Sequence, residues 1–172
     1  MRSFLCFLVC TATLLASGEL SGRRAPGFSL MDKDFQQHDP QEYRGKILIV
    51  EIMRTGCPTC VGFAPTLEEI IAKYQGKVAA LTIVNPPDTL DTVRRYVADH
   101  RITVPVLFDM GQVAFSYFKA TPQNPDVTVP HLFLIDAKGM IVNDYGYNPL
   151  NKGIFEGRDL FTEIDRMLAK SK

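Results

Sequence analysis

The sequence predicts one α/β domain: a central mixed sheet with a parallel core and an antiparallel C-terminal hairpin, flanked by helices and preceded by a short hairpin arm. Continuous apolar runs alternate with segments of helical apolar spacing, and this order needs crossover connections and so parallel strands. The chain has 172 residues, is 46% apolar, and balances 19 basic residues against 19 acidic ones. That size suits one globular domain, and the lack of a basic cluster argues against nucleic acid or an anionic membrane surface as a partner.

The N-terminal segment is typical of a secretory leader. Arg2 precedes an apolar run over residues 4–16, which ends in small residues at 16–18. The run is shorter than the about 20 residues that a membrane-spanning helix needs, so we expect no span in the mature chain. We therefore predict a signal peptide over residues 1–18 and a mature domain over 19–172, exported to a periplasm or another extracytoplasmic space. A buried N-terminal strand or helix is the alternative.

The first half of the mature chain predicts two strand-helix units after the arm. Apolar residues around a turn at 32–34 predict the hairpin arm. The nearly continuous apolar run at 46–53 is typical of a strand buried on both faces. Apolar residues at helical spacing follow over 58–74, where Pro58 suits a first turn and Pro65 predicts a kink. The same reasoning predicts a second buried strand at 78–84 and a helix at 89–100.

The second half predicts one more strand, two helices and a hairpin. A strand at 104–108 and a short helix at 112–118 lead into a Pro-containing loop at 120–128. Strands at 132–136 and 140–145 flank the turn Ala137-Lys138-Gly139, which indicates the antiparallel hairpin. An amphipathic helix at 158–168 closes the domain.

Two cysteines stand at the junction of the first buried strand and the first helix, in the motif Cys57-Pro58-Thr59-Cys60. If Cys57 caps the helix, its sulfur faces unpaired N–H groups and the positive end of the helix dipole, which stabilise a thiolate. We therefore expect Cys57 to attack disulfides and Cys60, one turn further in, to resolve the mixed disulfide.

Two other interpretations of this pair are weaker. A structural bridge that closes a loop of about four residues contributes only about 2 kcal/mol in the chain-entropy model. A structural zinc site usually needs four ligands, whereas the mature chain offers two cysteines and three histidines.

The chain resembles the thioredoxin-like superfamily, and most closely its exported thiol-disulfide oxidoreductases of the TlpA/ResA, or redoxin, type. The motif at 57–60, Pro65 five residues beyond it, and Val129-Pro130 before a strand carry the resemblance, as does the redoxin-like run at 104–109. In that family the proline matching Pro130 is cis and lies beside the disulfide. The resemblance thus implies that Val129, Pro130, Pro58 and Thr59 form the substrate-binding surface, without a bound cofactor beyond the redox-active cysteine pair.

An acidic residue interrupts the first buried strand. Glu51 lies six residues before Cys57, at the position where thioredoxins keep a buried acid that exchanges a proton with the resolving cysteine. Burial raises the pKa of a carboxyl group, which suits a general base for Cys60. A Glu51 that is solvated at a sheet edge is the alternative.

The resemblance has departures: Gly56 replaces a tryptophan of thioredoxins, and Phe63 stands where many relatives of the ResA type have glutamate. We expect a monomer that exchanges electrons with a protein thiol or disulfide substrate and with a protein donor or acceptor.

Two further functions stay open. His131 follows Pro130, so it should lie near Cys57 and Cys60 and complete a copper site like that of Sco-type chaperones, although those space their cysteines by three residues. A hydrogen-bonded strand histidine is the other interpretation of His131. A peroxiredoxin-like peroxide reductase is the second candidate, but Arg54 and Val50 occupy the positions of its characteristic threonine and proline.

Overall fold

A computed structural model describes residues 18–123 and 127–170 of the chain. Its strands are β1 (Arg23–Arg24), β2 (Leu30–Met31), β3 (Gln37–His38), β4 (Ile47–Met53), β5 (Val78–Val84), β6 (Val106–Phe108), β7 (His131–Ile135) and β8 (Met140–Gly146). Its helices are the 3-10 helix η1 (Pro40–Tyr43) and the α-helices α1 (Pro58–Lys73), α2 (Leu90–His100), α3 (Gln112–Tyr117), α4 (Lys152–Phe155) and α5 (Arg158–Lys170). The leader expected at 1–18 lies, apart from Gly18, outside the described residues.

One mixed sheet organises the domain. Its strands lie in the order β1-β8-β7-β4-β5-β6. The core strands β4, β5 and β6 run parallel, whereas β7, β8 and β1 extend the sheet antiparallel. The predicted α/β class, parallel core and antiparallel C-terminal hairpin are confirmed.

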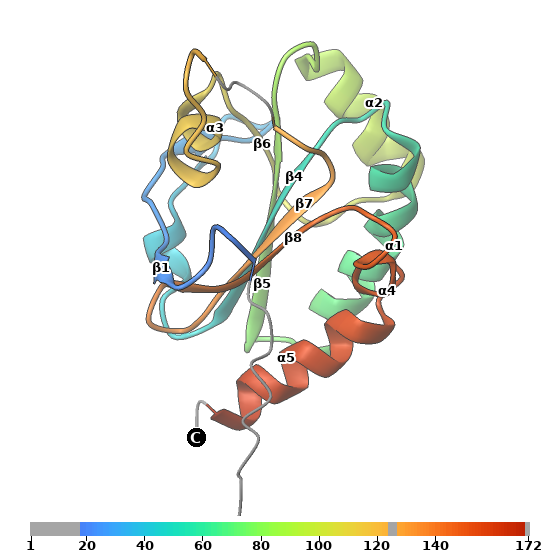
Figure 1. The fold of residues 1–172 in the computed structure, drawn as a ribbon. Coiled ribbons are helices and arrows are strands. Elements are labelled where there is room, and N and C mark those ends of the chain that lie inside the picture. The colour runs from blue at the N-terminus through green and yellow to red at the C-terminus, as the bar shows by residue number, and fades with distance from the viewer. Residues whose placement is uncertain (1–17, 124–126, 171–172) are drawn as a thin grey trace, which may run out of the picture.

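Helices cover both faces of the sheet. Figure 1 shows α1, α2, α4 and α5 on one side and α3 on the other. Side chains of β4 alternate between these two layers: Ile47 and Ile49 pack with α1 and α5, whereas Leu48 and Val50 pack with α3. The strand is apolar except at Glu51, because both of its faces are buried.

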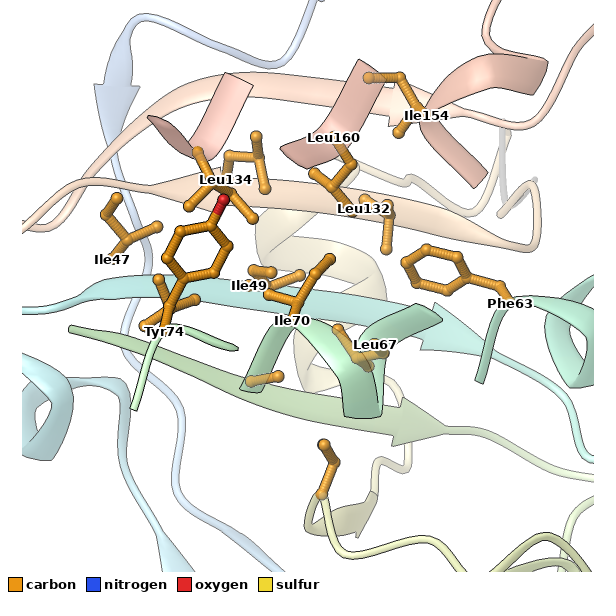
Figure 2. Close-up of a cluster of buried hydrophobic side chains, with 14 of the residues drawn as sticks. Ile47, Ile49, Phe63, Leu67, Ile70, Tyr74, Leu132, Leu134, Ile154 and Leu160 are labelled. Atoms are coloured by element: carbon orange, nitrogen blue, oxygen red, sulfur yellow. The ribbon is translucent and has the colours of Figure 1, made fainter. Parts of the chain in front are cut away.

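The largest cluster of buried side chains joins the sheet to α1 and α5. Figure 2 shows Leu67 and Ile70 of α1 beside Ile49 of β4, with Leu132 of β7 and Leu160 of α5 close by. Burial of this apolar stripe is the main free-energy source that holds α1 against the sheet and so fixes where the helix begins.

The N-terminal arm is a hairpin, as predicted, formed by β2 and β3. An antiparallel bridge between Asp32 and Leu107 connects the arm to the edge strand β6. Three elements were not predicted: β1, η1 and α4, which have two, four and four residues. Elements this short carry too few residues for a periodic pattern.

No helix in the described part of the chain is both long enough and apolar enough to cross a membrane.

Candidate active site

The connection from β4 to α1 places Cys57 and Cys60, the two cysteines of the motif at 57–60. After Met53 the chain makes a turn in which the Cys57 N–H group donates to the Arg54 carbonyl at 3.0 Å. Cys57 is the N-cap of α1, and its sulfur accepts a hydrogen bond from the Cys60 backbone N–H at 3.3 Å. Pro58 occupies the first helical position, where its missing N–H group costs nothing. The sulfur of Cys57 thus lies at the positive end of the helix dipole.

The two thiols have different environments. Cys57 is half-buried, whereas Cys60 is fully buried among Met53, Ala64 and Tyr96. Burial raises the pKa of the Cys60 thiol strongly, a hydrogen bond to Cys57 adds to this rise, and a hydrogen bond with the Arg54 backbone opposes it. Both cysteines are free thiols in this structure. The accessible thiol is the one at the helix terminus, and the shielded thiol needs a base before it can react.

Glu51 is buried and not at a solvated edge, since only 1% of its surface is exposed. Side chains alternate along β4, so the Glu51 side chain lies on the same face of the sheet as those of Ile49 and Met53. This is the face that α1 covers. Burial raises the pKa of Glu51 to about 8, and a hydrogen bond from the Thr82 hydroxyl at 3.0 Å opposes that rise only in part. The charge of Glu51 also raises the pKa of the Cys60 thiol, so the two groups lie within electrostatic reach of each other.

The Val129-Pro130 peptide bond is cis. Val129 is half-buried and packs, like Cys57, against the apolar cluster that contains Cys60. The Pro130 carbonyl accepts a hydrogen bond from the Tyr147 N–H at 3.1 Å. The structure therefore packs this loop against the same cluster as the dithiol. In the dithiol motif, Pro58 is exposed and Thr59 is half-buried.

The expectation that His131 lies with the cysteines is wrong. His131 is the first residue of β7, and its side chain stacks on Phe133 and contacts Phe118, in the layer of α3. Its Nε2 atom lies 3.3 Å from Oδ2 of the buried Asp144. Side chains alternate along a strand, and His131 pairs with Ile52, so it faces the layer opposite to Glu51 and α1. Among the described residues no group of three or more His, Cys, Asp or Glu side chains is arranged to hold a metal ion.

Sequence reasoning missed three polar or phenolic neighbours of this site. Thr82 is the only polar residue in the apolar run of β5, which could have indicated it as a partner for Glu51. Tyr96 on α2 is buried, and the charges of Glu51 and Cys60 add to the burial that raises the pKa of its phenol. Asp88 holds the turn before Cys57 through Thr55, and only the tertiary structure reveals this contact.

The chain matches the model of the AhpC/TSA family over residues 21–143. It is 26% identical over 121 residues to the thiol-disulfide oxidoreductase ResA of Bacillus thuringiensis (strain Al Hakam), a match that covers 70% of this chain and 66% of that protein. Among solved structures it is similar to a Neisseria meningitidis protein described as a thioredoxin, with 26% identity and a TM-score of 0.71, covering 87% of this chain and 93% of the other. A Bacteroides thetaiotaomicron protein described as a protein disulfide isomerase shares the fold, with 24% identity, a TM-score of 0.71 and coverage of 87% and 90%.

Fold and site together define a thioredoxin-like protein with a dithiol at a helix N-terminus. The chain belongs to the AhpC/TSA family of redoxins. The sequence predicts a protein thiol-disulfide oxidoreductase, and the ResA relative is an enzyme of that class. The matched segment spans about two thirds of the length of that relative.

Proposed function

We propose that this protein is a thiol-disulfide oxidoreductase that exchanges disulfides with exported protein substrates through Cys57 and Cys60. The asymmetry of the dithiol is the observation that carries the proposal. Cys57 is accessible at the helix N-terminus and accepts a backbone N–H, whereas Cys60 is fully buried with a raised pKa and lies near a buried acid. A structural bridge needs none of this asymmetry, whereas a two-step exchange needs all of it.

In the reducing direction, the Cys57 thiolate attacks one sulfur of a substrate disulfide. A mixed disulfide with Cys57 forms, the substrate S–S bond breaks, and the other substrate sulfur leaves as a thiolate. Glu51 then removes the proton of Cys60, and the Cys60 thiolate attacks the Cys57 sulfur. The substrate leaves as a dithiol after its second thiolate is protonated, and Cys57 and Cys60 are left joined in a disulfide. In the oxidising direction the same steps run in reverse.

The substrate surface of this proposal is the loop at Val129-Pro130 together with Pro58 and Thr59. Val129 and Cys57 pack against the same apolar cluster, which supports a path along this loop for a polypeptide disulfide-bonded to Cys57. A second protein supplies or removes the electrons that return Cys57 and Cys60 to their starting state. The reaction needs no bound cofactor, because the cysteine pair itself carries two electrons.

Export is part of the proposal because of the leader-like segment. Arg2, the apolar run at 4–16 and the small residues that follow are typical of a secretory signal. Removal of residues 1–18 leaves Cys57 and Cys60 as the only cysteines of the chain. In an oxidising compartment such a protein has no other thiol with which the active-site pair could cross-link.

The decisive measurement is an equilibrium redox titration of residues 19–172 against a dithiol buffer, with free thiols counted by mass-shift trapping. A single reversible two-electron step is the expected result. A potential near about −270 mV indicates a reductase and one near about −120 mV an oxidant. Absence of a reversible intramolecular disulfide refutes the proposal.

Trapping assigns the roles of the two cysteines. Cys60→Ser should accumulate a mixed disulfide with a substrate protein, because the resolving thiol is gone. Cys57→Ser, the matched control, should trap nothing, because the buried Cys60 is inaccessible. Equal trapping by both variants contradicts the assignment.

A further inference from the structure

One carboxylate joins the turn before the active-site helix to the start of the next helix. Asp88 Oδ2 accepts the Thr55 backbone N–H at 3.1 Å, and Oδ1 accepts the Thr55 hydroxyl. The Thr92 hydroxyl shares its proton between Asp88 Oδ1 at 3.2 Å and the Thr89 carbonyl at 3.0 Å. Asp88 therefore binds Thr55 twice and is itself held by α2.

The turn that Asp88 holds is the one that places Cys57. Thr55 is the residue after Arg54, whose carbonyl accepts the Cys57 N–H at 3.0 Å, so Thr55 lies inside the turn that ends at the N-cap. Cys57 is the residue at which this turn passes into α1, and its sulfur accepts the Cys60 N–H at 3.3 Å. The hydrogen bonds to Thr55 therefore restrain the backbone two residues before the sulfur that accepts the Cys60 N–H.

The other end of this link is rigid. Thr89 and Thr92 form a reciprocal capping box at the start of α2, with the Thr89 N–H donating to the Thr92 hydroxyl at 2.9 Å. Val93 and Tyr96 of the same helix are buried in the cluster that surrounds Cys60. Asp88 therefore fixes Thr55 to a helix that also packs against the resolving cysteine.

We propose that Asp88 is a positioning residue for Cys57, acting through Thr55 to hold the attacking sulfur over the helix N-terminus. The inference deepens the proposed function, since the step that it controls is attack by Cys57. Its test does not depend on that function, because alkylation reports the Cys57 thiolate even in a protein that exchanges no disulfides.

The chain contains a matched control for this contact. Glu68 on α1 accepts the Thr103 N–H at 2.7 Å, the Val104 N–H at 3.0 Å and the Thr103 hydroxyl. The chemistry is the same, a carboxylate that binds the backbone N–H and hydroxyl of one threonine. The Glu68 contact holds the connection into β6 and not the turn before Cys57.

The experiment measures the pH dependence of iodoacetamide alkylation of Cys57 in Thr55→Val, Thr55→Ser and Thr103→Val, with Cys60→Ser as the common background. Thr55→Val removes the hydroxyl bond to Asp88 without changing any charge. We expect its alkylation midpoint to rise by about half to one pH unit, which lowers the thiolate fraction about three- to tenfold below the midpoint. Thr55→Ser should restore the parental midpoint, and Thr103→Val should leave it unchanged while lowering thermal stability.

Asp88→Glu supplies an independent second test, because it keeps the negative charge and displaces the acceptor oxygens. It should raise the midpoint as Thr55→Val does, and the double variant should shift it no further, since both changes break one link. If Thr55→Val and Asp88→Glu are folded and keep the parental midpoint, Asp88 is a structural residue only and the inference is wrong. If Thr55→Val does not fold, Asp88→Glu alone decides by the same criterion. Failure of the wild type to form a reversible disulfide overturns the proposed function but leaves this result standing.

Discussion

The Thr82 hydroxyl donates a hydrogen bond to Glu51 Oε2 at 3.0 Å, across the neighbouring strands β4 and β5. The other oxygen of this carboxyl group, Oε1, is buried and has no hydrogen-bond partner among the described residues. One hydrogen bond does not compensate for removal from water, and the pKa of Glu51 rises to about 8. A carboxyl group with this pKa can both take and return a proton near neutral pH, which is what the proposed resolution by Cys60 requires.

Replacing Glu51 with glutamine should slow the resolving step while leaving attack by Cys57 unchanged. The reactive form of Glu51 is the carboxylate, so the wild-type resolving rate should rise from pH 6 to pH 9 with a midpoint near 8. Glu51→Gln should lose that midpoint and resolve at least about 10²-fold more slowly, the lower end of the usual contribution of a general base. Stopped-flow measurement of the decay of a mixed disulfide formed at Cys57 checks this, and an identical pH profile in both proteins rejects the role.

The same substitution should stabilise the fold in alkaline solution. The pKa of Glu51 is about 8 in the folded chain and has an ordinary value of 4.5, so the folded state binds this proton more tightly. Wild-type stability therefore falls as the pH rises from about 4.5 to about 8, whereas the glutamine carries no such penalty. We expect Glu51→Gln to raise the free energy of unfolding by a few kcal/mol at pH 9, at about 1.4 kcal/mol per pKa unit, and to change it little at pH 4. Urea unfolding of the reduced proteins at the two pH values tests the difference, and equal gains at both contradict it.

Removing the Thr82 hydroxyl should raise the pKa of Glu51 without abolishing its role as proton carrier. Thr82→Val keeps the shape of the side chain and deletes the hydrogen bond to the Glu51 carboxylate, so the pKa of Glu51 should rise further. A hydrogen bond to a charged group is worth about 1.5–3 kcal/mol, which corresponds to about one to two pH units. The resolving rate of Thr82→Val should follow the wild-type curve at a higher pH. An unshifted curve shows that Thr82 does not tune Glu51.

His131 should have no role in metal binding. Its ring is engaged with Asp144 on the sheet face away from the cysteines, so His131→Ala should leave the Cu(I) affinity of the reduced protein unchanged. The matched substitution Cys57→Ser should weaken any Cu(I) binding, because it removes a thiolate ligand. Competition with a Cu(I) chelator measures both, and a large loss of affinity in His131→Ala alone contradicts the structural placement.

The contact between His131 and Asp144 should instead stabilise the fold in a pH-dependent way. Burial acts to raise the pKa of Asp144, but hydrogen bonds from His131 and Ser21 outweigh it and hold the pKa below its ordinary value of 3.8. The contribution of Asp144 is therefore fully present above about pH 4 and is lost as the pH falls through the folded pKa. Asp144→Asn should lower the melting temperature at pH 7 more than at pH 3, as differential scanning calorimetry can show. Equal losses at the two pH values rule out this linkage.

Features that depend on neighbouring residues were predicted from the sequence, and features that depend on distant segments were not. The strand β4 and the helix α1 were predicted within one residue at each end, because apolar runs, helical spacing and Pro58 are local signals. The strand β1 was not predicted, because its two residues pair with β8 across the sheet and carry no pattern of their own. The burial of Glu51 was expected from the resemblance to thioredoxins, with a solvated edge position as the alternative, and the structure shows it buried. Thr82, its hydrogen-bond partner, comes from another strand.

By itself, the sequence determined the α/β class, the order of the main elements and the position of the dithiol at a helix start, since each depends on residues that are near neighbours in the chain. The tertiary structure decided which side chains meet. It placed His131 away from the cysteines, because alternation along β7 turns neighbouring side chains to opposite faces of the sheet. It also joined Asp88 to Thr55, 33 residues apart, because α1 and α2 start at the same end of the sheet and the segments that precede them lie together. Contacts between distant segments depend on strand register and helix packing, which a local pattern does not encode.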